Sequence, residues 1–268
     1  MKLSIVTPSF NQCAYLRQTM ASVLSQQQGG AGGEFDLEHL VIDGGSTDGT
    51  IDLLRSTAEP RVRWVSETDR GQAHAINKGL SLANGEVVAW LNSDDLYVDG
   101  ALAAVAAVFA SRPEARWLVG RCEIIDGGGR TIRRAVTRYK DSSLRRYSRR
   151  ALLRENFISQ PAVFWRRAFA DQLAGSRPLL DESLHFAMDY DLWLRMGELS
   201  EPVLLDRVLA RFRLHPASKS GGVNREQFDE QYRVADRYLG DDRVSRLAHR
   251  FNVAKIVWSY RVMRLIGL

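Results

Sequence analysis

The chain has 268 residues, of which 45% are apolar and 26% are charged, with 37 Lys and Arg side chains against 32 Asp and Glu. This composition excludes disordered, collagenous and low-complexity proteins, and the length suits one large α/β domain or two small ones. Cys13 and Cys122 lie far apart without the spacing of a zinc site, so we expect no disulfide scaffold and a reducing compartment. The apolar run before Pro8 is too short for a signal peptide, and no stretch reaches the ~18 apolar residues of a spanning helix.

Charge is divided unevenly along the chain. Residues 1–111 carry 7 basic and 13 acidic side chains, residues 112–177 carry 16 and 6, and residues 178–268 carry 14 and 13. The basic middle segment indicates an anionic partner such as a phosphate group or an acidic lipid surface. The alternative is a solvated face that only keeps the protein soluble. The run RRYSRR (Arg145–Arg150) lies in no nucleic-acid-binding motif, so we expect no nucleic acid partner.

Strands and helices alternate through the first hundred residues. A nearly continuous apolar run at 86–91, EVVAWL, predicts a central strand that is covered on both faces. A glycine-rich loop is predicted at Gly29–Gly33, and Thr47 or Asp48 is expected to cap the second helix. The other predicted strands are 3–6, 37–42 and 62–65, and the predicted helices are 15–24, one over Ile51, Leu53 and Leu54, and 73–82. This alternation predicts right-handed βαβ units and a mostly parallel sheet.

The pattern after residue 98 is less regular. A turn at 126–129 predicts a hairpin between strands at 116–125 and 131–136. From residue 225 onward the spacing is helical to the end. The remaining predictions are a helix over 101–109, a strand over 162–165, a short helix over 189–196 and a strand within 203–214.

Polar clusters follow each of the four early strands. They read TPSFN, DGGSTDGT, ETDRG and NSDD in chain order. Ligands of parallel sheets bind beyond the carboxyl ends of the strands. The four loops therefore predict one site at that edge.

Six motifs follow one another along roughly residues 1–220. They are TPSFNQ, IDGGSTDGT, SETDRGQAHAINKG, WLNSDD, MDYDLWLR and FRLHPASKS. This succession resembles the family 2 glycosyltransferases. The resemblance implies the GT-A fold, a Rossmann-like α/β/α sandwich with a mostly parallel central sheet, here followed by C-terminal helices. It divides the chain into a nucleotide-sugar-binding half (1–98), an acceptor-binding half of the same domain (99–222) and a C-terminal helical extension (223–268).

The activity that the resemblance implies is transfer of a sugar from a nucleotide-diphosphate sugar, with inversion at the anomeric carbon. In similar enzymes the acidic residue at the position of Asp43 reads a uracil or thymine ring, which indicates a UDP- or dTDP-type donor. Arg70 is expected to contact a phosphate, and Gly71 to open a helix whose N-terminus favours anions. The full set expected to bind the nucleotide sugar is Thr7, Pro8, Asp43, Glu67, Asp69, Arg70, Gly71, Asn92 and Ser93.

The NSDD segment resembles the Asp-x-Asp motif of the fold. In an extended segment Asn92 and Asp94 point one way while Ser93 and Asp95 point the other, so Asp94 is the predicted metal ligand. Carboxylates suit Mn²⁺ or Mg²⁺, which would neutralise the charge on the leaving diphosphate. Similar enzymes place a His near the diphosphate or the metal at the position of His215, which is therefore a predicted metal ligand, and a purely structural His is the alternative.

Inverting transfer requires one carboxylate that deprotonates the acceptor hydroxyl. Relatives carry an acidic pair, usually Glu-Asp, where this chain has Met188 and Asp189, so Asp189 is the predicted general base. Asp191 is expected to be a helix cap or a structural contact. The resemblance also places an acceptor-side loop at 156–161.

The C-terminal residues 251–268 combine a wide apolar arc with basic edges. Such a helix can lie in a membrane interface, which predicts a cytoplasmic enzyme held peripherally on the inner membrane, and packing on the catalytic domain or in a homodimer is the alternative. We expect a glycan or lipid-linked acceptor in bacterial surface polysaccharide biosynthesis.

Two other functions are weighed against this one. A sugar-phosphate nucleotidyltransferase would carry a Gly-rich, basic loop after the first strand, and TPSFNQ is not one. A catalytically weakened nucleotide-sugar-binding protein is kept open by the departures at Gly44, Asn92 and Met188.

Overall fold

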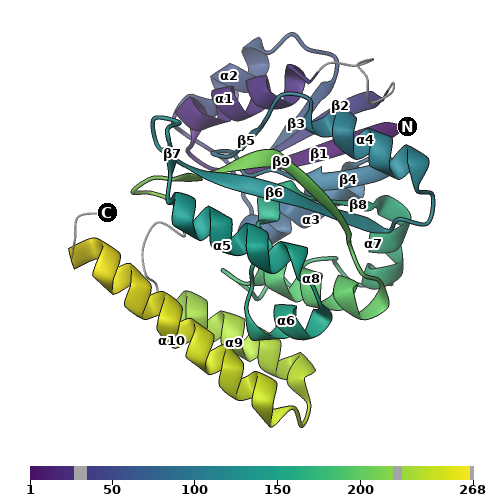
Figure 1. Ribbon diagram of the computed structural model, residues 1–268. Coiled ribbons are helices and arrows are strands. Elements are labelled where there is room, and N and C mark those ends of the chain that lie inside the picture. The colour runs from purple at the N-terminus through teal and green to yellow at the C-terminus, as the bar shows by residue number, and fades with distance from the viewer. Residues whose placement is uncertain (27–34, 220–224, 266–268) are drawn as a thin grey trace.

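The structure is a computed structural model, and it describes residues 1–26, 35–219 and 225–265. Figure 1 shows a central sheet between layers of helices, with two long helices at the C-terminal end of the chain. The loop predicted at Gly29–Gly33 lies outside the described residues, as does Ser220 at the end of the last motif. The α/β fold predicted from the sequence is confirmed.

The first half of the sheet is parallel. Its strands are β1 (Lys2–Ser9), β2 (Asp36–Asp43), β3 (Val62–Ser66) and β4 (Val87–Trp90), in the order β3-β2-β1-β4. The helices between them are α1 (Cys13–Leu24), α2 (Thr50–Ser56) and α3 (Gln72–Leu82). Parallel pairing aligns Ser9 with Asp43, and Asp43 with Ser66, so the loops after β1, β2 and β3 emerge side by side.

β1, β2 and β4 are buried on both faces, as the apolar run at 86–91 predicted for β4, whereas β3 at the edge of the sheet leaves Arg63, Trp64 and Ser66 exposed. Along β4, Val88 and Trp90 pack into one cluster with Ile76 of α3, while Val87 and Ala89 pack into another with Val23 of α1. Successive side chains of a strand point to opposite faces, so a strand covered on both sides reads as a continuous apolar run.

The second half of the sheet mixes directions. It continues from β4 through β8 (Val163–Arg166), β6 (Trp117–Asp126) and β9 (Val203–Leu214) to β5 (Leu96–Tyr97). β8 is antiparallel to both β4 and β6, whereas β9 runs parallel to β6. The helices α4 (Ala101–Ser111) and α8 (Met188–Leu199) were predicted with slightly shorter bounds.

The structure corrects the predicted hairpin after residue 130. Its second strand, β7, is only Thr131–Ile132, and α5 (Arg134–Arg145) begins where the strand was expected to continue. Arg133 has φ 49, a left-handed conformation that ends the strand. α5 was missed because its residues are mostly charged or polar and only Asp141 and Leu144 are buried, so few apolar side chains mark its inner face. The short helices α6 (Arg149–Arg154), α7 (Arg167–Ala174) and η1 (Gln160–Ala162) were not predicted either.

The predicted C-terminal helices are α9 (Arg225–Leu239) and α10 (Arg243–Leu265). α9 buries Val234, Ala235 and Leu239 in the same core cluster as α8. α10 lies along α6 and α9, as Figure 1 shows, and buries Ser245 and His249. Among the described residues, none of the helices is both long and apolar enough to cross a bilayer.

Candidate active site

The loops after β1 and β2 are bonded to each other. Asn11 holds a left-handed conformation, its N–H donates to Ser46 Oγ at 2.8 Å, and its Oδ1 accepts the Thr47 N–H at 2.8 Å. Asp48 Oδ2 accepts the Cys13 N–H at the start of α1, and its Oδ1 accepts the Thr50 N–H at the start of α2. The N-cap residue of α2 is Gly49, so neither Thr47 nor Asp48 holds the cap position predicted for it, but the Asp48 carboxylate accepts the first N–H group of both helices.

Asp43 is completely buried at the end of β2. Its carboxylate accepts hydrogen bonds from the N–H groups of Gly45 and Ser46 and from the hydroxyls of Ser46 and Ser66. These bonds shape the loop that follows the strand. Its predicted contact with a pyrimidine ring stays a prediction, and the bonds seen here show that Asp43 anchors the loop itself.

The loops after β2 and β3 meet at Gly44. A Cβ added to Gly44 would lie 3.4 Å from Asp69 Oδ2 and 3.4 Å from Phe10 Cδ2. An acidic side chain at this position would bring a second negative charge against Asp69, so the glycine fits its surroundings here. Phe10, which was not among the predicted site residues, is 61% exposed beside this junction.

The loop after β3 carries charges in different environments. Asp69 is nearly buried and lies 2.7 Å from Lys78 Nζ, which also contacts Glu67 and lowers the pKa of that more exposed carboxyl. Arg70 is 71% exposed and binds Glu182 at 2.7 Å. Gly71 adopts φ 125 directly before α3. Lys78 thus holds the loop, and Arg70 is the basic side chain of this loop that an anion can reach.

The predicted alternation of side chains at NSDD is wrong. Residues 92–95 form a turn rather than an extended segment, because the Asp95 N–H donates to Asn92 O at 3.1 Å. Asn92 Nδ2 contacts Asp95 Oδ2 at 3.3 Å, so these two side chains meet. Ser93 is nearly buried and donates to Gln12 Oε1 at 2.8 Å. Asp95 is fully buried, which raises its pKa, and it accepts the Arg213 N–H at 2.8 Å.

Asp94 and His215 lie in direct contact. His215 Nε2 is 3.0 Å from Asp94 Oδ2, and the His215 side chain is 4% exposed against 14% for Asp94. Arg213 Nε donates to Asp94 O at 2.7 Å, and its guanidinium lies over the Tyr15 ring. The ring of His215 is itself 4.5 Å from that of Tyr15.

This pair is chemically suited to a divalent cation. Within the described residues no group of three or more His, Cys, Asp or Glu side chains is placed to hold a metal ion. A carboxylate and an imidazole supply two ligands, and catalytic Mg²⁺ or Mn²⁺ sites commonly take their remaining ligands from substrate phosphates and water. Asp94 fits this role better than Asp95, whose carboxylate is fully buried and occupied by hydrogen bonds.

Two distant segments meet the Asn92 turn through a chain of amide contacts. Gln72 Nε2 donates to Asn92 Oδ1 at 2.8 Å, and Asn92 Nδ2 donates to Gln160 Oε1 at 3.2 Å. Lys219 Nζ donates to Gln72 Oε1 at 2.9 Å and contacts His185 O at 3.3 Å. The turn is thereby joined both to η1, within the segment 156–161 that was expected on the acceptor side, and to the segment that leads into α8.

α8 begins with the predicted base. Asp189 is half-buried, and its Oδ1 accepts the Tyr190 N–H at 2.7 Å. Burial raises the pKa of Asp189 to about 6, while that backbone bond and the nearby Lys140 ammonium oppose the shift. A carboxylate with a pKa near the working pH is suited to general base catalysis.

The start of α8 is held by a residue of α9. Glu230 is 5% exposed, and its carboxylate accepts the N–H groups of His185, Phe186 and Ala187 at 3.2, 2.7 and 2.7 Å. These are the residues immediately before the helix. Neither Glu230 nor Arg213 was predicted to support the site, because only the tertiary contacts reveal it.

Asp191 differs from Asp189 in every contact. It is 3% exposed, binds Arg195 at 2.9 Å and accepts the Tyr238 hydroxyl at 3.0 Å. It therefore connects α8 to α9, as expected for a structural contact.

The two predicted nucleotide-binding residues of β1 are also interior. The Thr7 hydroxyl lies 2.9 Å from His39 Nε2, and Pro8 is buried within β1. Any contact of Thr7 and Pro8 with a nucleotide stays a prediction.

Comparison with known proteins places these features in a family. Glycosyl transferase family 2 matches residues 4–173. An uncharacterised glycosyltransferase of Nostoc sp. is 32% identical over 140 residues, 51% of this chain and 41% of the relative. An uncharacterised glycosyltransferase of Mycobacterium tuberculosis is 29% identical over 213 residues, covering 78% of this chain and 74% of the relative. The chondroitin synthase of Escherichia coli is 25% identical over 220 residues, and the chain spans only 30% of it.

Solved structures show the same fold. S. aureus TarS 1–349 in complex with UDP-GlcNAc has a TM-score of 0.62 at 19% identity, over 90% of this chain and 67% of that one. The mannosyltransferase PcManGT from Pyrobaculum calidifontis, in complex with GDP-Man and Mn²⁺, has a TM-score of 0.61 at 16% identity, over 99% and 79%. The architecture is thus that of the GT-A glycosyltransferases. The chain belongs to glycosyl transferase family 2.

Proposed function

We propose that this glycosyltransferase moves a sugar from a nucleotide-diphosphate sugar to a hydroxyl of a glycan or lipid-linked acceptor, with inversion at the anomeric carbon. The observation that carries the proposal is the convergence of two chain segments. Lys219 and Gln72 join the segment before Asp189 to the Asn92 turn, which also carries Asp94. These contacts support assigning the general base and a diphosphate-binding turn to one site.

The chemistry assigned to the base is a single proton transfer coupled to substitution. Asp189 accepts the proton of the acceptor O–H while that oxygen bonds to the anomeric carbon. The bond between the anomeric carbon and the diphosphate oxygen breaks, and its electron pair leaves with the nucleoside diphosphate. Attack opposite the leaving group inverts the configuration. The pKa of about 6 keeps Asp189 ionised at neutral pH and still able to hold the proton transiently.

The leaving diphosphate requires positive charge. Asp94 and His215 would hold Mn²⁺ or Mg²⁺, which when bound neutralises charge on the phosphates. Arg70 is exposed enough to reach a phosphate by exchanging its partner Glu182. The complex of the mannosyltransferase PcManGT with GDP-Man and Mn²⁺ supports a metal and a nucleotide sugar for this fold.

The nucleotide end is assigned to the junction of the first two loops. Phe10 offers an exposed ring beside Gly44, where a planar base can stack. UDP-GlcNAc in the TarS complex supports a uridine-type donor. The anchored loop at Asp43 gives this region a fixed shape. We therefore assign a UDP- or dTDP-sugar to this chain.

The C-terminal helix supports a peripheral membrane location. Val244, Leu247 and Phe251 of α10 are 65%, 70% and 70% exposed, and spacings of three and four residues put them on one face. Arg243 and Arg250 are exposed in the same turns. An apolar stripe with basic flanks favours an anionic lipid surface, where a lipid-linked acceptor of surface polysaccharide synthesis would lie. The alternative is that this apolar stripe binds a second copy of the chain instead of a membrane.

A donor panel tests the function directly. Nucleotide sugars are added to the full chain with Mn²⁺, Mg²⁺ or excess chelator, and thermal stability and donor hydrolysis are measured together. We expect a UDP- or dTDP-sugar with metal to raise Tm, since a ligand bound only to the folded state stabilises it. Stabilisation without any hydrolysis or transfer would identify a catalytically weakened binding protein. No stabilisation by any nucleotide sugar would contradict the proposal.

A further inference from the structure

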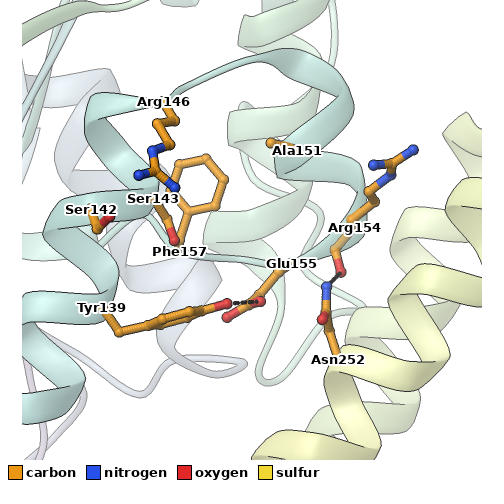
Figure 2. A pocket seen from close by; sticks show the side chains of 9 residues that line it. All are labelled: Tyr139, Ser142, Ser143, Arg146, Ala151, Arg154, Glu155, Phe157 and Asn252. Carbon is orange, nitrogen blue, oxygen red and sulfur yellow. Dashed lines mark hydrogen bonds between the residues drawn. The ribbon is translucent and has the colours of Figure 1, made fainter.

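A pocket of about 400 Å³ lies between α5, α6 and α10, apart from the loops of the candidate active site. Figure 2 shows its lining side chains, which include Tyr139, Ser143, Arg146, Glu155, Phe157 and Asn252. This volume is within the range of small-molecule sites. Neither the donor assignment nor the proposed proton transfer uses it.

The lining combines an aromatic surface with hydrogen-bonding groups of both kinds. Tyr139 is 42% exposed, and its hydroxyl donates to Glu155 Oε2 at 2.6 Å. In Figure 2 the guanidinium of Arg146 is turned toward Ser143 and Phe157, whereas that of Arg154 is turned away. Arg154 Nε donates to Ser245 Oγ at 3.0 Å, which accounts for its direction. The pocket therefore presents one guanidinium, one carboxylate and serine hydroxyls around aromatic rings.

This mixture suits a neutral sugar ring better than a phosphate. A phosphate only accepts hydrogen bonds from such a site and would be repelled by Glu155. A sugar hydroxyl can donate to Glu155 and accept from Arg146, and the C–H face of the ring can pack on an aromatic side chain. Lys255 lies 4.7 Å from the Tyr139 ring centroid and 3.9 Å from Glu155, so part of the local positive charge is already engaged.

The pocket is connected to the acceptor side of the site by two short paths. Tyr139 is followed in α5 by Lys140, whose Nζ contacts Ser159 Oγ at 3.3 Å and whose charge acts on both Glu155 and Asp189. The segment from Glu155 leads within five residues to Gln160, which contacts Asn92. Lys140 and the 155–160 segment thus link the pocket to the region where the acceptor hydroxyl would meet the base.

We propose that this pocket binds a neutral sugar ring of the acceptor glycan, a ring other than the one that receives the transferred sugar. The inference rests on the proposed function, because it takes Asp189 as the base that faces the acceptor. The acceptor is then a saccharide of at least two rings. The Tyr139 ring, the Arg146 guanidinium and the Glu155 carboxylate are the groups that would recognise its second ring.

Saccharide binding by the full chain tests the pocket. Methyl glycosides of glucose, galactose, mannose and N-acetylglucosamine are titrated by saturation-transfer NMR. Inorganic pyrophosphate, which has no protons to observe, is titrated by phosphorus NMR and by its displacement of a bound glycoside. We expect a glycoside to bind, and Tyr139→Ala to weaken it about tenfold, while Tyr139→Phe, which keeps the ring, has a smaller effect. Arg138→Ala removes an exposed charge from the same helix without touching the pocket, so it is the matched control and should bind like wild type.

The competing outcomes overturn the proposal in different ways. Absence of glycoside binding, or binding that Tyr139→Ala leaves unchanged, rules out the sugar site. Pyrophosphate binding that is lost in Arg146→Ala and displaces the glycoside would make the pocket a phosphate site. Donor-induced thermal stabilisation is measured on the same samples. Donor binding without glycoside binding refutes this pocket alone, and glycoside binding without any donor response refutes the proposed function alone.

Discussion

Replacing Asp189 by Asn should make the protein nearly inactive and, at neutral pH, more stable. The pKa of Asp189 rises from 3.8 to about 6 on folding, so at pH 7 the folded state holds a charge that burial disfavours. A shift of about 2 units corresponds to about 3 kcal/mol, at about 1.4 kcal/mol per unit. Because Asp189 is only half-buried, solvent screens part of this, and we expect a gain of about 1–2 kcal/mol in Asp189→Asn.

The sign of the effect depends on pH. Below about pH 3.8 the carboxyl is protonated in both states and the variant should match wild type. The wild type loses stability relative to the variant as pH rises from about 3.8 to 6, and the difference is constant above pH 6. Urea unfolding at pH values from 3.5 to 8, followed by tryptophan fluorescence, measures this directly. The kcat should fall by about 10²–10⁴-fold, and wild-type kcat/KM should rise with pH through about 6.

Asp191→Asn is the matched control two residues away. It weakens a buried contact with Arg195 and Tyr238, so it should destabilise the protein at neutral pH. If Asp189→Asn were the destabilising change, or if its effect did not vary with pH, the carboxylate would not be the desolvated group inferred here. If Asp191→Asn abolished transfer while Asp189→Asn retained it, the base would be assigned to the wrong residue.

Asp94→Ala should abolish transfer and remove the effect of Mn²⁺ on donor binding while Tm without ligand changes little; full activity in excess chelator would remove the metal from the mechanism. Glu230→Ala leaves three backbone N–H groups before α8 without their acceptor, and should cost about 2–4 kcal/mol in urea unfolding. An unchanged midpoint would show that water replaces the carboxylate. The double change Leu247→Glu and Phe251→Glu should lower cosedimentation with anionic vesicles and leave unfolding within about 0.5 kcal/mol. A shift from dimer to monomer in the double variant, with no vesicle binding by wild type, would assign the stripe to self-association.

The parallel half of the fold was predictable because its signals are local. The apolar run at 86–91 and the helical spacings around it depend on residues a few positions apart, and the order of elements then brings their loops to one edge. α5 was not predicted because it lacks such a local signal. Its residues are mostly polar, and its packing on β6, where Arg121 binds Asp141, is a contact between segments about 20 positions apart.

Within the site, the sequence by itself determined which residue types follow each strand and that an acidic residue begins α8. The tertiary structure decided what each of them does. Asp94 meets His215 across 121 positions of sequence, and the turn geometry, invisible in a pattern of alternation, withdraws Asp95 into the interior. Asp189 and Asp191 are both aspartates in the first turn of α8. Asp189 is half-buried, whereas Asp191 is bound by Arg195 and Tyr238. The pKa of a carboxyl depends on burial and neighbouring charges, and these are set by contacts between residues that lie far apart in the chain.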